Sequence, residues 1–274
     1  SIYSTFVIEE RHGFNKTTRK TFVTDIFKGL LISGAISSIL YATVIFIIIS
    51  AGDLWWIYAF AAVFTLQAII FFLYPVLIMP LFNKFEPLDD EQFKKPIEKL
   101  LEKVDFKSKG LFVMNASLRS THGNAFFTGF GKNKRIVFFD TLLKTINPDE
   151  MEAILGHELG HYKLGHIRKT LISSLVFGFL GFYILNEIFK SDNFFIAHGL
   201  ENLTVYSKFL MFYLVIGSYT FFTKPITSAL SRKREFEADD FSFQFTDGEH
   251  MISGLLKLTK DCLLYTSDAA DDDV

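Results

Sequence analysis

The amino-acid sequence predicts a mostly α-helical protein that crosses a membrane several times and carries a small α+β region. Half of its 274 residues are hydrophobic, 33 of them are phenylalanine, and the mean hydropathy is +0.28. The uncharged runs 29–52 and 54–83 each exceed the length of about 20 apolar residues that crosses a bilayer. Short β-type runs and amphipathic helical patterns follow within residues 84–169. These three observations predict the fold class.

The two uncharged runs predict a helical hairpin, because only the short segment 51–54 separates them. Trp55, Trp56 and Tyr58 lie at its turn, where membrane proteins carry an aromatic belt. Two later apolar stretches, 170–186 and 209–223, are shorter than a usual span. They fit either further membrane helices or buried helices of a soluble region.

Positive charge flanks the hairpin on both sides, which predicts that both flanks face the cytoplasm. The flanking residues are Arg11, Lys16, Arg19, Lys20 and Lys28 before it, and Lys84, Lys94, Lys95 and Lys99 after it. If the two later stretches cross out and back, Arg232, Lys233 and Arg234 return to the same side. We therefore expect the segments 84–169 and 224–260 to share the cytoplasmic side.

A capped amphipathic helix is predicted to begin near Asn147. Asn147 is a favourable N-cap, Pro148 suits the first helical position, and acidic residues follow in the first turn. Gly165 is a plausible end of the helix.

This helix carries the sequence His157-Glu158-Leu159-Gly160-His161. A helix turns about 100° per residue, so the two imidazoles lie one turn apart on the same face and can bind one tetrahedral zinc. A zinc-bound water has its pKa lowered to roughly 7, and Glu158 stands beside the first ligand, where it can take the proton. The spacing predicts a zinc metallopeptidase of the HExxH type, with about one zinc per chain.

The third metal ligand is sought in the acidic cluster 234–240, because a catalytic zinc keeps three protein ligands and one open position. Glu235 and Asp239 lie one turn apart on a common helix face, whereas Glu237 points elsewhere. We expect Glu235 to be the ligand and Asp239 to orient a ligand imidazole. Taken without the histidine pair, the cluster would be read as a solvated helix face.

Three short strands are predicted at 111–115, 124–130 and 135–139, with a turn at 131–134 between the last two. An edge strand can hold an extended peptide by main-chain hydrogen bonds. Asn124 could anchor a substrate backbone and His122 could assist near the oxyanion. The alternatives are an ordinary strand-start asparagine and a solvated loop histidine.

Taken together, these motifs resemble the zinc-dependent type I CAAX prenyl endopeptidases and, more distantly, the HtpX-type membrane peptidases. The resemblance covers residues 5–260 and rests on the segments 5–10, 80–85, 119–126, 134–142, 157–161 and 235–239. It implies Glu235 as third ligand, Glu158 as general base, and Asn124, Ala125 and Phe126 as part of the substrate cleft. It also implies a multi-helix membrane barrel around a chamber and, in eukaryotic members, cleavage near a lipidated cysteine.

The chain departs from the family pattern at both ends. It begins at Ser1 inside recognisable sequence, and after residue 261 it continues as an acidic, low-complexity tail. The downstream His-Pro-rich segment of the family is not found, so we expect a fragment of a longer protein. Cys262 is the single cysteine, which excludes an internal disulfide.

The predicted organisation has five parts. Residues 1–83 form an N-terminal amphipathic segment and the transmembrane hairpin, 84–169 the cytoplasmic zinc region, 170–223 two further membrane helices, 224–260 the helix with the third ligand, and 261–274 the tail.

An integral membrane zinc endopeptidase is the favoured function, acting on a peptide or protein with a lipidated or hydrophobic C-terminus. An HtpX-like quality-control peptidase and a catalytically impaired scaffold for hydrophobic clients stay open as alternatives. A metal transporter is disfavoured, because the charged residues from Asp149 to Glu158 exclude a lipid-facing span. No basic aromatic stripe or Gly-rich phosphate loop indicates a nucleic acid or nucleotide partner. The expected location is the bacterial cytoplasmic membrane or, in a eukaryote, the endoplasmic reticulum, with the site facing the cytoplasm.

Overall fold

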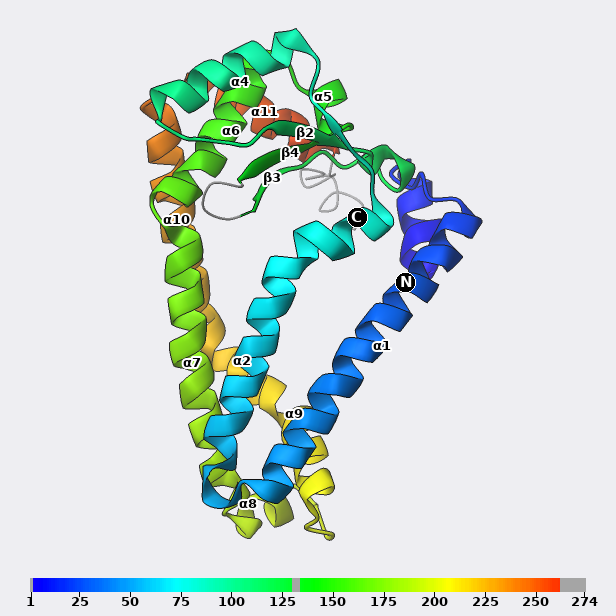
Figure 1. Ribbon diagram of the computed structural model, residues 1–274, viewed down its shortest axis with the longest axis vertical. Coiled ribbons are helices and arrows are strands. Elements are labelled where there is room, and N and C mark those ends of the chain that lie inside the picture. Colours follow the sequence, from blue (N-terminus) through cyan, green and yellow to red (C-terminus); the bar gives the residue numbers. More distant parts are fainter. Residues whose placement is uncertain (1, 130–133, 262–274) are drawn as a thin grey trace, which may run out of the picture. The chain divides into compact units, whose positions relative to one another are not determined.

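The computed structural model describes residues 2–129 and 134–261. Figure 1 shows the helices and strands of the chain, which divides into two compact units. The sheet unit comprises the described residues within 1–31, 71–164 and 237–274, and the helical unit comprises residues 32–70 and 165–236.

Helices dominate the described residues. The long helices are α1 (Arg19–Ser50), α2 (Trp55–Leu73), α4 (Glu91–Lys103), α6 (Pro148–Lys163), α7 (His166–Phe189), α9 (Val205–Thr220), α10 (Lys224–Phe243) and α11 (Gly248–Asp261). The short ones are η1 (Ser4–Glu9), η2 (Gly52–Leu54), η3 (Tyr74–Ile78), α3 (Met79–Phe82), η4 (Ala116–Leu118), α5 (Leu142–Thr145), α8 (Asp192–Ala197) and η5 (Phe221–Thr223). The predicted fold class, mostly α with a small α+β region, is confirmed.

Within the described residues, four helical stretches are long and apolar enough to cross a membrane: Arg19–Ser50, Gly52–Phe82, His166–Phe189 and Val205–Phe243. The first two are the predicted hairpin, whose turn contains Gly52 at a φ of 56°. The other two contain the shorter apolar stretches, and each helix continues past the charged residues that bounded its stretch in the sequence. Together they form a multi-pass helical membrane protein.

The sheet unit contains a four-stranded sheet in the order β1-β2-β4-β3. Its strands are β1 (Phe85–Pro87), β2 (Leu111–Met114), β3 (Ala125–Thr128) and β4 (Arg135–Phe139). Strand β2 runs parallel to β4, whereas the β1–β2 and β3–β4 pairs are antiparallel. Strand β3 therefore lies at one edge. The sequence analysis missed β1, and the predicted turn at 131–134 lies largely outside the described residues.

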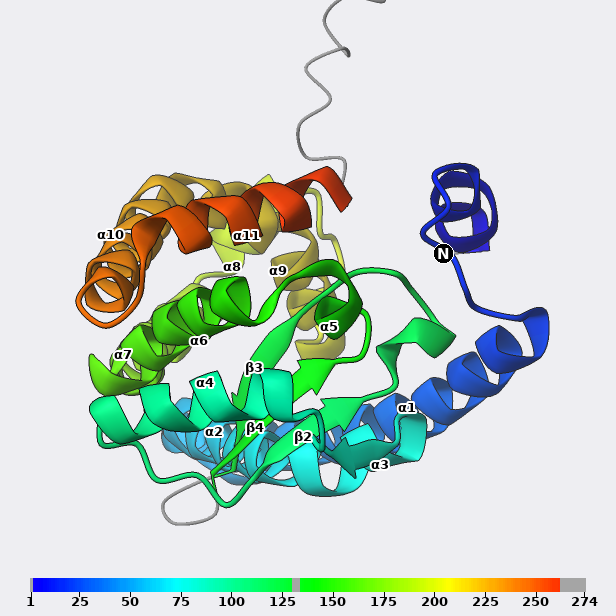
Figure 2. The ribbon, with the colours of Figure 1, turned by 90° about the horizontal axis from the view of Figure 1, so that it is seen from above.

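The core of the sheet unit forms where α4 and α6 cover one face of the sheet (Figure 2). Asp90 caps α4 by accepting a hydrogen bond from the Gln92 N–H at 2.9 Å. Ile97 and Leu100 of α4 and Leu155 and Leu159 of α6 are almost completely buried against Phe138 of the sheet. This apolar face holds α6 in place and leaves its histidine-bearing side for chemistry.

The helical unit has a smaller aromatic core of its own. Trp55 is only 8% exposed and packs with Leu185 and the rings of Phe189 and Phe209. This burial differs from the expected belt position of Trp55, because the first residue of α2 turns inward onto α7 and α9. Tyr58 is 53% exposed, and its place in an aromatic belt stays a prediction.

Candidate metal centre

Helix α6 begins and ends where its local sequence favours a boundary. The Asn147 side chain accepts from the Glu150 N–H, and the Glu150 side chain accepts from the Asn147 N–H, both at 2.9 Å. Gly165, with a φ of 69°, separates α6 from α7. The two histidines thus stand in the C-terminal half of a well-formed helix.

The two imidazoles point their Nε2 atoms at one another. The Nε2 atoms of His157 and His161 are 3.1 Å apart, and the rings meet edge to face. Two nitrogens bound to one tetrahedral zinc at about 2.0–2.1 Å would be roughly 3.3 Å apart. The pair therefore has the spacing that a shared metal ion requires.

Helix α10 supplies the acidic partners. The Nδ1 atom of His157 lies 2.7 Å from the Asp239 Oδ1 atom, and both side chains are partly buried. The division between the two units passes through α10 after Phe236, and Glu235 lies one turn before Asp239 on this continuous helix. Ligand atoms of His157, His161 and Glu235 all lie within 4.8 Å of one another. This donor set, two imidazoles and one carboxylate, fits a zinc ion.

Small residues allow α10 to approach α6 this closely. A Cβ atom on Gly160 would meet backbone atoms of Ala238 at 3.0 Å, and one on Gly156 would meet the Ser242 Oγ at 2.7 Å. Ala238 and Ser242 are fully buried, and the Ser242 hydroxyl donates to the Ala153 carbonyl at 2.9 Å. The sequence analysis did not single out these residues. Their signal is the spacing of four between the small residues on each helix.

The predicted general base and substrate residues belong to the sheet unit, as do the two histidines. Glu158 follows His157 on α6 and is partly buried. Strand β3 contacts α6 and lies at the sheet edge. Asn124, just before β3, is exposed. Within β3, Ala125 is 7% exposed and belongs to the core, and Phe126 packs edge to face with Phe139.

Two substrate candidates make specific contacts. The Asn124 side-chain oxygen accepts from the Ala125 N–H at 2.8 Å, and the Asn124 backbone carbonyl accepts from the Phe139 N–H at 2.9 Å. The His122 ring packs against Phe14, with ring centroids 4.8 Å apart. These contacts hold the start of β3 in an extended conformation.

A buried carboxylate ties α6 to α11. Glu150 is 1% exposed and accepts hydrogen bonds from Ser253 at 2.6 Å and Lys257 at 2.8 Å. Burial raises the pKa of Glu150, but the hydrogen bonds from Lys257, Ser253 and the Asn147 backbone together outweigh it and lower the pKa. Glu150 is therefore charged in the folded protein and anchors the helix that carries the histidines.

Comparison with known proteins identifies the family. The family model described as peptidase family M48 matches residues 87–267, and the model described as CAAX prenyl protease N-terminal, five membrane helices, matches residues 1–84. The CAAX prenyl protease 1 homolog of Arabidopsis thaliana is 39% identical over 264 residues, which cover 96% of this chain and 62% of the relative. The probable CAAX prenyl protease 1 of Schizosaccharomyces pombe is 37% identical, with coverages of 97% and 58%.

A solved structure is similar along most of the chain. The crystal structure of S. mikatae Ste24p superposes with a TM-score of 0.84 at 33% identity, covering 94% of this chain and 64% of that one. The chain spans less than two-thirds of the length of these relatives. The resemblance predicted from the motifs is confirmed, and the chain belongs to peptidase family M48.

Proposed function

We propose that the protein is an integral membrane zinc metalloendopeptidase of the CAAX prenyl protease type. The observation that carries this proposal is the convergence of the His157 and His161 Nε2 atoms, 3.1 Å apart, beside Glu235 in a member of family M48. In this proposal His157, His161 and Glu235 hold one zinc ion. When bound, the zinc would supply a water with a pKa of about 7 and a Lewis acid for the peptide carbonyl.

Three further side chains have separate roles in the proposed reaction. Asp239 keeps the proton of His157 on Nδ1, which leaves the Nε2 lone pair for the metal. Glu158 accepts the proton of the attacking water and passes it to the leaving amine. His122 stabilises the oxyanion that forms on the carbonyl.

The edge strand holds the substrate. An extended peptide adds to β3 by main-chain hydrogen bonds, which require no particular substrate sequence. Because the Ala125 side chain is buried, Ala125 contributes through its backbone, whereas the exposed Asn124 offers its side-chain amide. Phe126 completes this segment.

The relatives and the membrane helices support a particular substrate class. Several relatives carry the name CAAX prenyl protease 1, and the chain has four helices suited to a bilayer. We infer a protein substrate with a C-terminally lipidated or hydrophobic segment, cleaved on the cytoplasmic side of the endoplasmic reticulum or, in a prokaryote, of the cytoplasmic membrane.

Glu158→Gln in the full-length protein tests the proposal. The amide cannot accept the proton of the water, so cleavage of a prenylated peptide should fall by about 100-fold or more while zinc content is unchanged. Glu152→Gln is the matched control, since Glu152 lies on the same helix and faces Lys103 at 3.8 Å. Full activity of Glu158→Gln would disprove the assigned role.

A further inference from the structure

We propose that Arg119 and Asp25 form a positioning pair that sets where strand β3 stands relative to the membrane boundary. This inference rests on the proposed function, because it assigns the pair a role in presenting a membrane-anchored substrate. Arg119 lies in the loop that leads to β3, and Asp25 lies near the start of α1.

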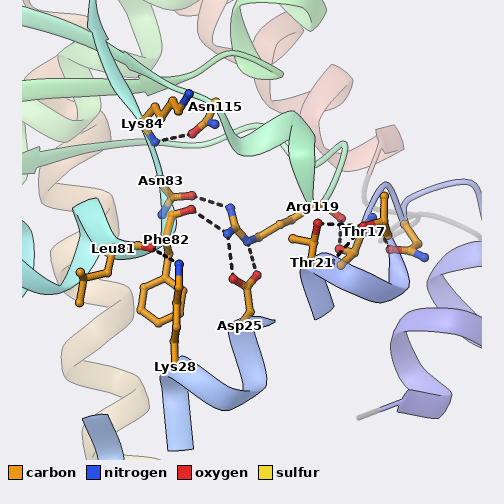
Figure 3. Close-up of polar contacts among 12 residues, drawn as sticks. Thr17, Thr21, Asp25, Lys28, Leu81, Phe82, Asn83, Lys84, Asn115 and Arg119 are labelled. Carbon is orange, nitrogen blue, oxygen red and sulfur yellow. Dashed lines mark hydrogen bonds and ion pairs between the residues drawn. The ribbon is translucent and has the colours of Figure 1, made fainter. Parts of the chain in front are cut away.

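The guanidinium of Arg119 joins three segments of the sheet unit (Figure 3). Its Nε and Nη2 atoms donate to the two carboxylate oxygens of Asp25 at 2.7 and 3.1 Å. Its Nη1 donates to the Asn83 side-chain oxygen at 3.0 Å, and Nη2 also donates to the Phe82 carbonyl at 2.7 Å. A planar guanidinium that engages a carboxylate through two bonds restrains direction as well as distance.

The partners of Arg119 lie where the apolar helices meet charged sequence. Asp25 precedes the uncharged run that starts at residue 29, and Phe82 ends the stretch Gly52–Phe82. Beside them, Lys28 donates to the Leu81 carbonyl at 2.8 Å, with its Nζ 5.8 Å from the centre of the Phe82 ring. The ends of two candidate membrane spans therefore meet at Arg119.

The backbone around Arg119 is also held by hydrogen bonds. The Arg119 carbonyl accepts from the Thr17 hydroxyl at 2.9 Å and from the Lys16 N–H at 3.1 Å. Two residues on, the Thr121 N–H donates to the Phe14 carbonyl at 3.2 Å. The segment just before α1 thus runs alongside the loop that carries His122 and Asn124.

The other end of this loop is tied to the sheet. Asp140, which follows β4, accepts a hydrogen bond from the Ser117 N–H at 2.9 Å and another from the Ser117 hydroxyl. One end of the loop is held by the sheet, and its middle is held by α1 and the end of α3. The loop therefore fixes the position of β3 relative to the membrane boundary.

This arrangement matters most for a substrate that is itself anchored in the membrane. The lipid fixes one end of such a peptide at the bilayer, so the height of β3 above that boundary decides whether the scissile bond reaches the metal centre. A soluble peptide of the same sequence has no such constraint and can slide into register. The Arg119–Asp25 pair therefore acts on lipidated substrates in particular, through β3.

Two variants, Arg119→Gln and Asp25→Asn, test this role with paired substrates in the full-length protein in vesicles. One substrate is a prenylated peptide in the bilayer, and the other is the same peptide without the lipid. We expect kcat/KM to fall about 10-fold or more for the prenylated peptide and to change less than roughly twofold for the soluble one. Arg119→Lys, which keeps the charge but loses the fork, should lie between wild type and Arg119→Gln, and Asp25→Arg combined with Arg119→Asp should recover part of the loss.

The matched control is Glu91→Gln, which removes an exposed ion pair with Lys95 on α4 and should leave both rates unchanged. An equal loss of kcat/KM for the two peptides would show that Arg119 only supports the fold. The proposal would be overturned if the ratio of kcat/KM for the prenylated peptide to that for the soluble peptide stayed at its wild-type value in both variants. If wild type cleaves neither peptide, the proposed function fails separately.

A distance measurement tests the pair without any activity. Spin labels at positions 20 in α1 and 135 in β4, in a Cys262→Ser background, report the separation between α1 and the sheet. We expect a narrow distance distribution in wild type and a clearly broader one in Arg119→Gln, with Glu91→Gln as the unchanged control. An equally narrow distribution in Arg119→Gln would refute the positioning role.

Discussion

In the proposed site, Asp239 sets which nitrogen of His157 carries a proton. Its carboxylate lies 2.7 Å from Nδ1, and a proton held there would leave the Nε2 lone pair free on the side of His161. Partners of this kind fix both the tautomer and the ring orientation of a metal-ligating histidine. We therefore expect Asp239 to contribute to the affinity of the site for metal.

Asp239→Asn is expected to weaken zinc binding by about 10- to 100-fold while leaving the fold intact. The amide can still bond to the ring but supplies no negative charge. Competition with a chelator of known affinity, followed by elemental analysis, measures the change. His157→Ala should remove the zinc altogether. Wild-type affinity in Asp239→Asn would exclude the assigned role of the carboxylate.

At the scale of elements, the crossing of α6 and α10 brings the carboxylate of Asp239 to the imidazole of His157. Gly160 and Ala238 face each other without intervening side chains, and Ser242 bonds to the α6 backbone. Larger residues at these places would separate the two helices and the ligands they carry.

Gly160→Ala should therefore destabilise the protein by about 1–3 kcal/mol and lower its affinity for zinc, because the new methyl group meets backbone that cannot rotate away. Gly181→Ala on α7 is the control, since a Cβ there meets nothing within 4 Å. Thermal unfolding and zinc titration measure both effects. Equal behaviour of the two variants would contradict the close-approach explanation.

The pairing of α6 with α11 depends on the charge of Glu150. The pKa of Glu150 is lower in the folded protein than in the unfolded chain. Glu150 therefore contributes stability that is fully present when the pH is above about 4.3, the usual glutamate pKa of an unfolded chain. That contribution is lost as the pH falls through the lower folded value.

Glu150→Gln should cost about 1–3 kcal/mol at neutral pH, since the amide leaves the hydrogen bonds from Lys257 and Ser253 poorly matched. The difference in Tm between wild type and variant should shrink as the pH falls below about 4. Unfolding scans across pH measure it, with Glu152→Gln as control. A Tm difference that does not change with pH would rule out a charged Glu150 in the folded protein.

At the scale of the whole molecule, the distribution of positive charge predicts the topology. Both flanks of the hairpin are rich in lysine and arginine, and residues 232–234 follow the last apolar stretch. An odd number of crossings between His161 and Glu235 would put them on opposite sides of the bilayer, so a shared metal ion requires an even number.

Single cysteines at positions 95, 193 and 232, in a Cys262→Ser background, test this arrangement with a membrane-impermeant thiol reagent. The reagent is applied from the non-cytoplasmic side of sealed membranes. Only position 193 should be labelled, because we predict that the other two face the cytoplasm. Labelling at 232 but not at 95 would eliminate Glu235 as the third ligand.

Much of the fold was predictable because its signals are local. The hairpin follows from uncharged runs, the limits of α6 from Asn147, Pro148 and Gly165, and the pairing of imidazoles from a spacing of four. Strands β2, β3 and β4 also lie within their predicted ranges, whereas β1, at three residues with Pro87 at its end, has too little pattern to be found.

What only the tertiary structure decided involves residues far apart in the chain. The sequence by itself determined the element types and the helical faces that carry the candidate metal ligands, because propensity and periodicity act over a few residues. The contact of Asp239 with His157, the edge position of β3, the small residues between α6 and α10 and the junction at Arg119 depend on pairings between distant segments. Such pairings are set by how the core packs, and no local pattern encodes which distant residue completes them.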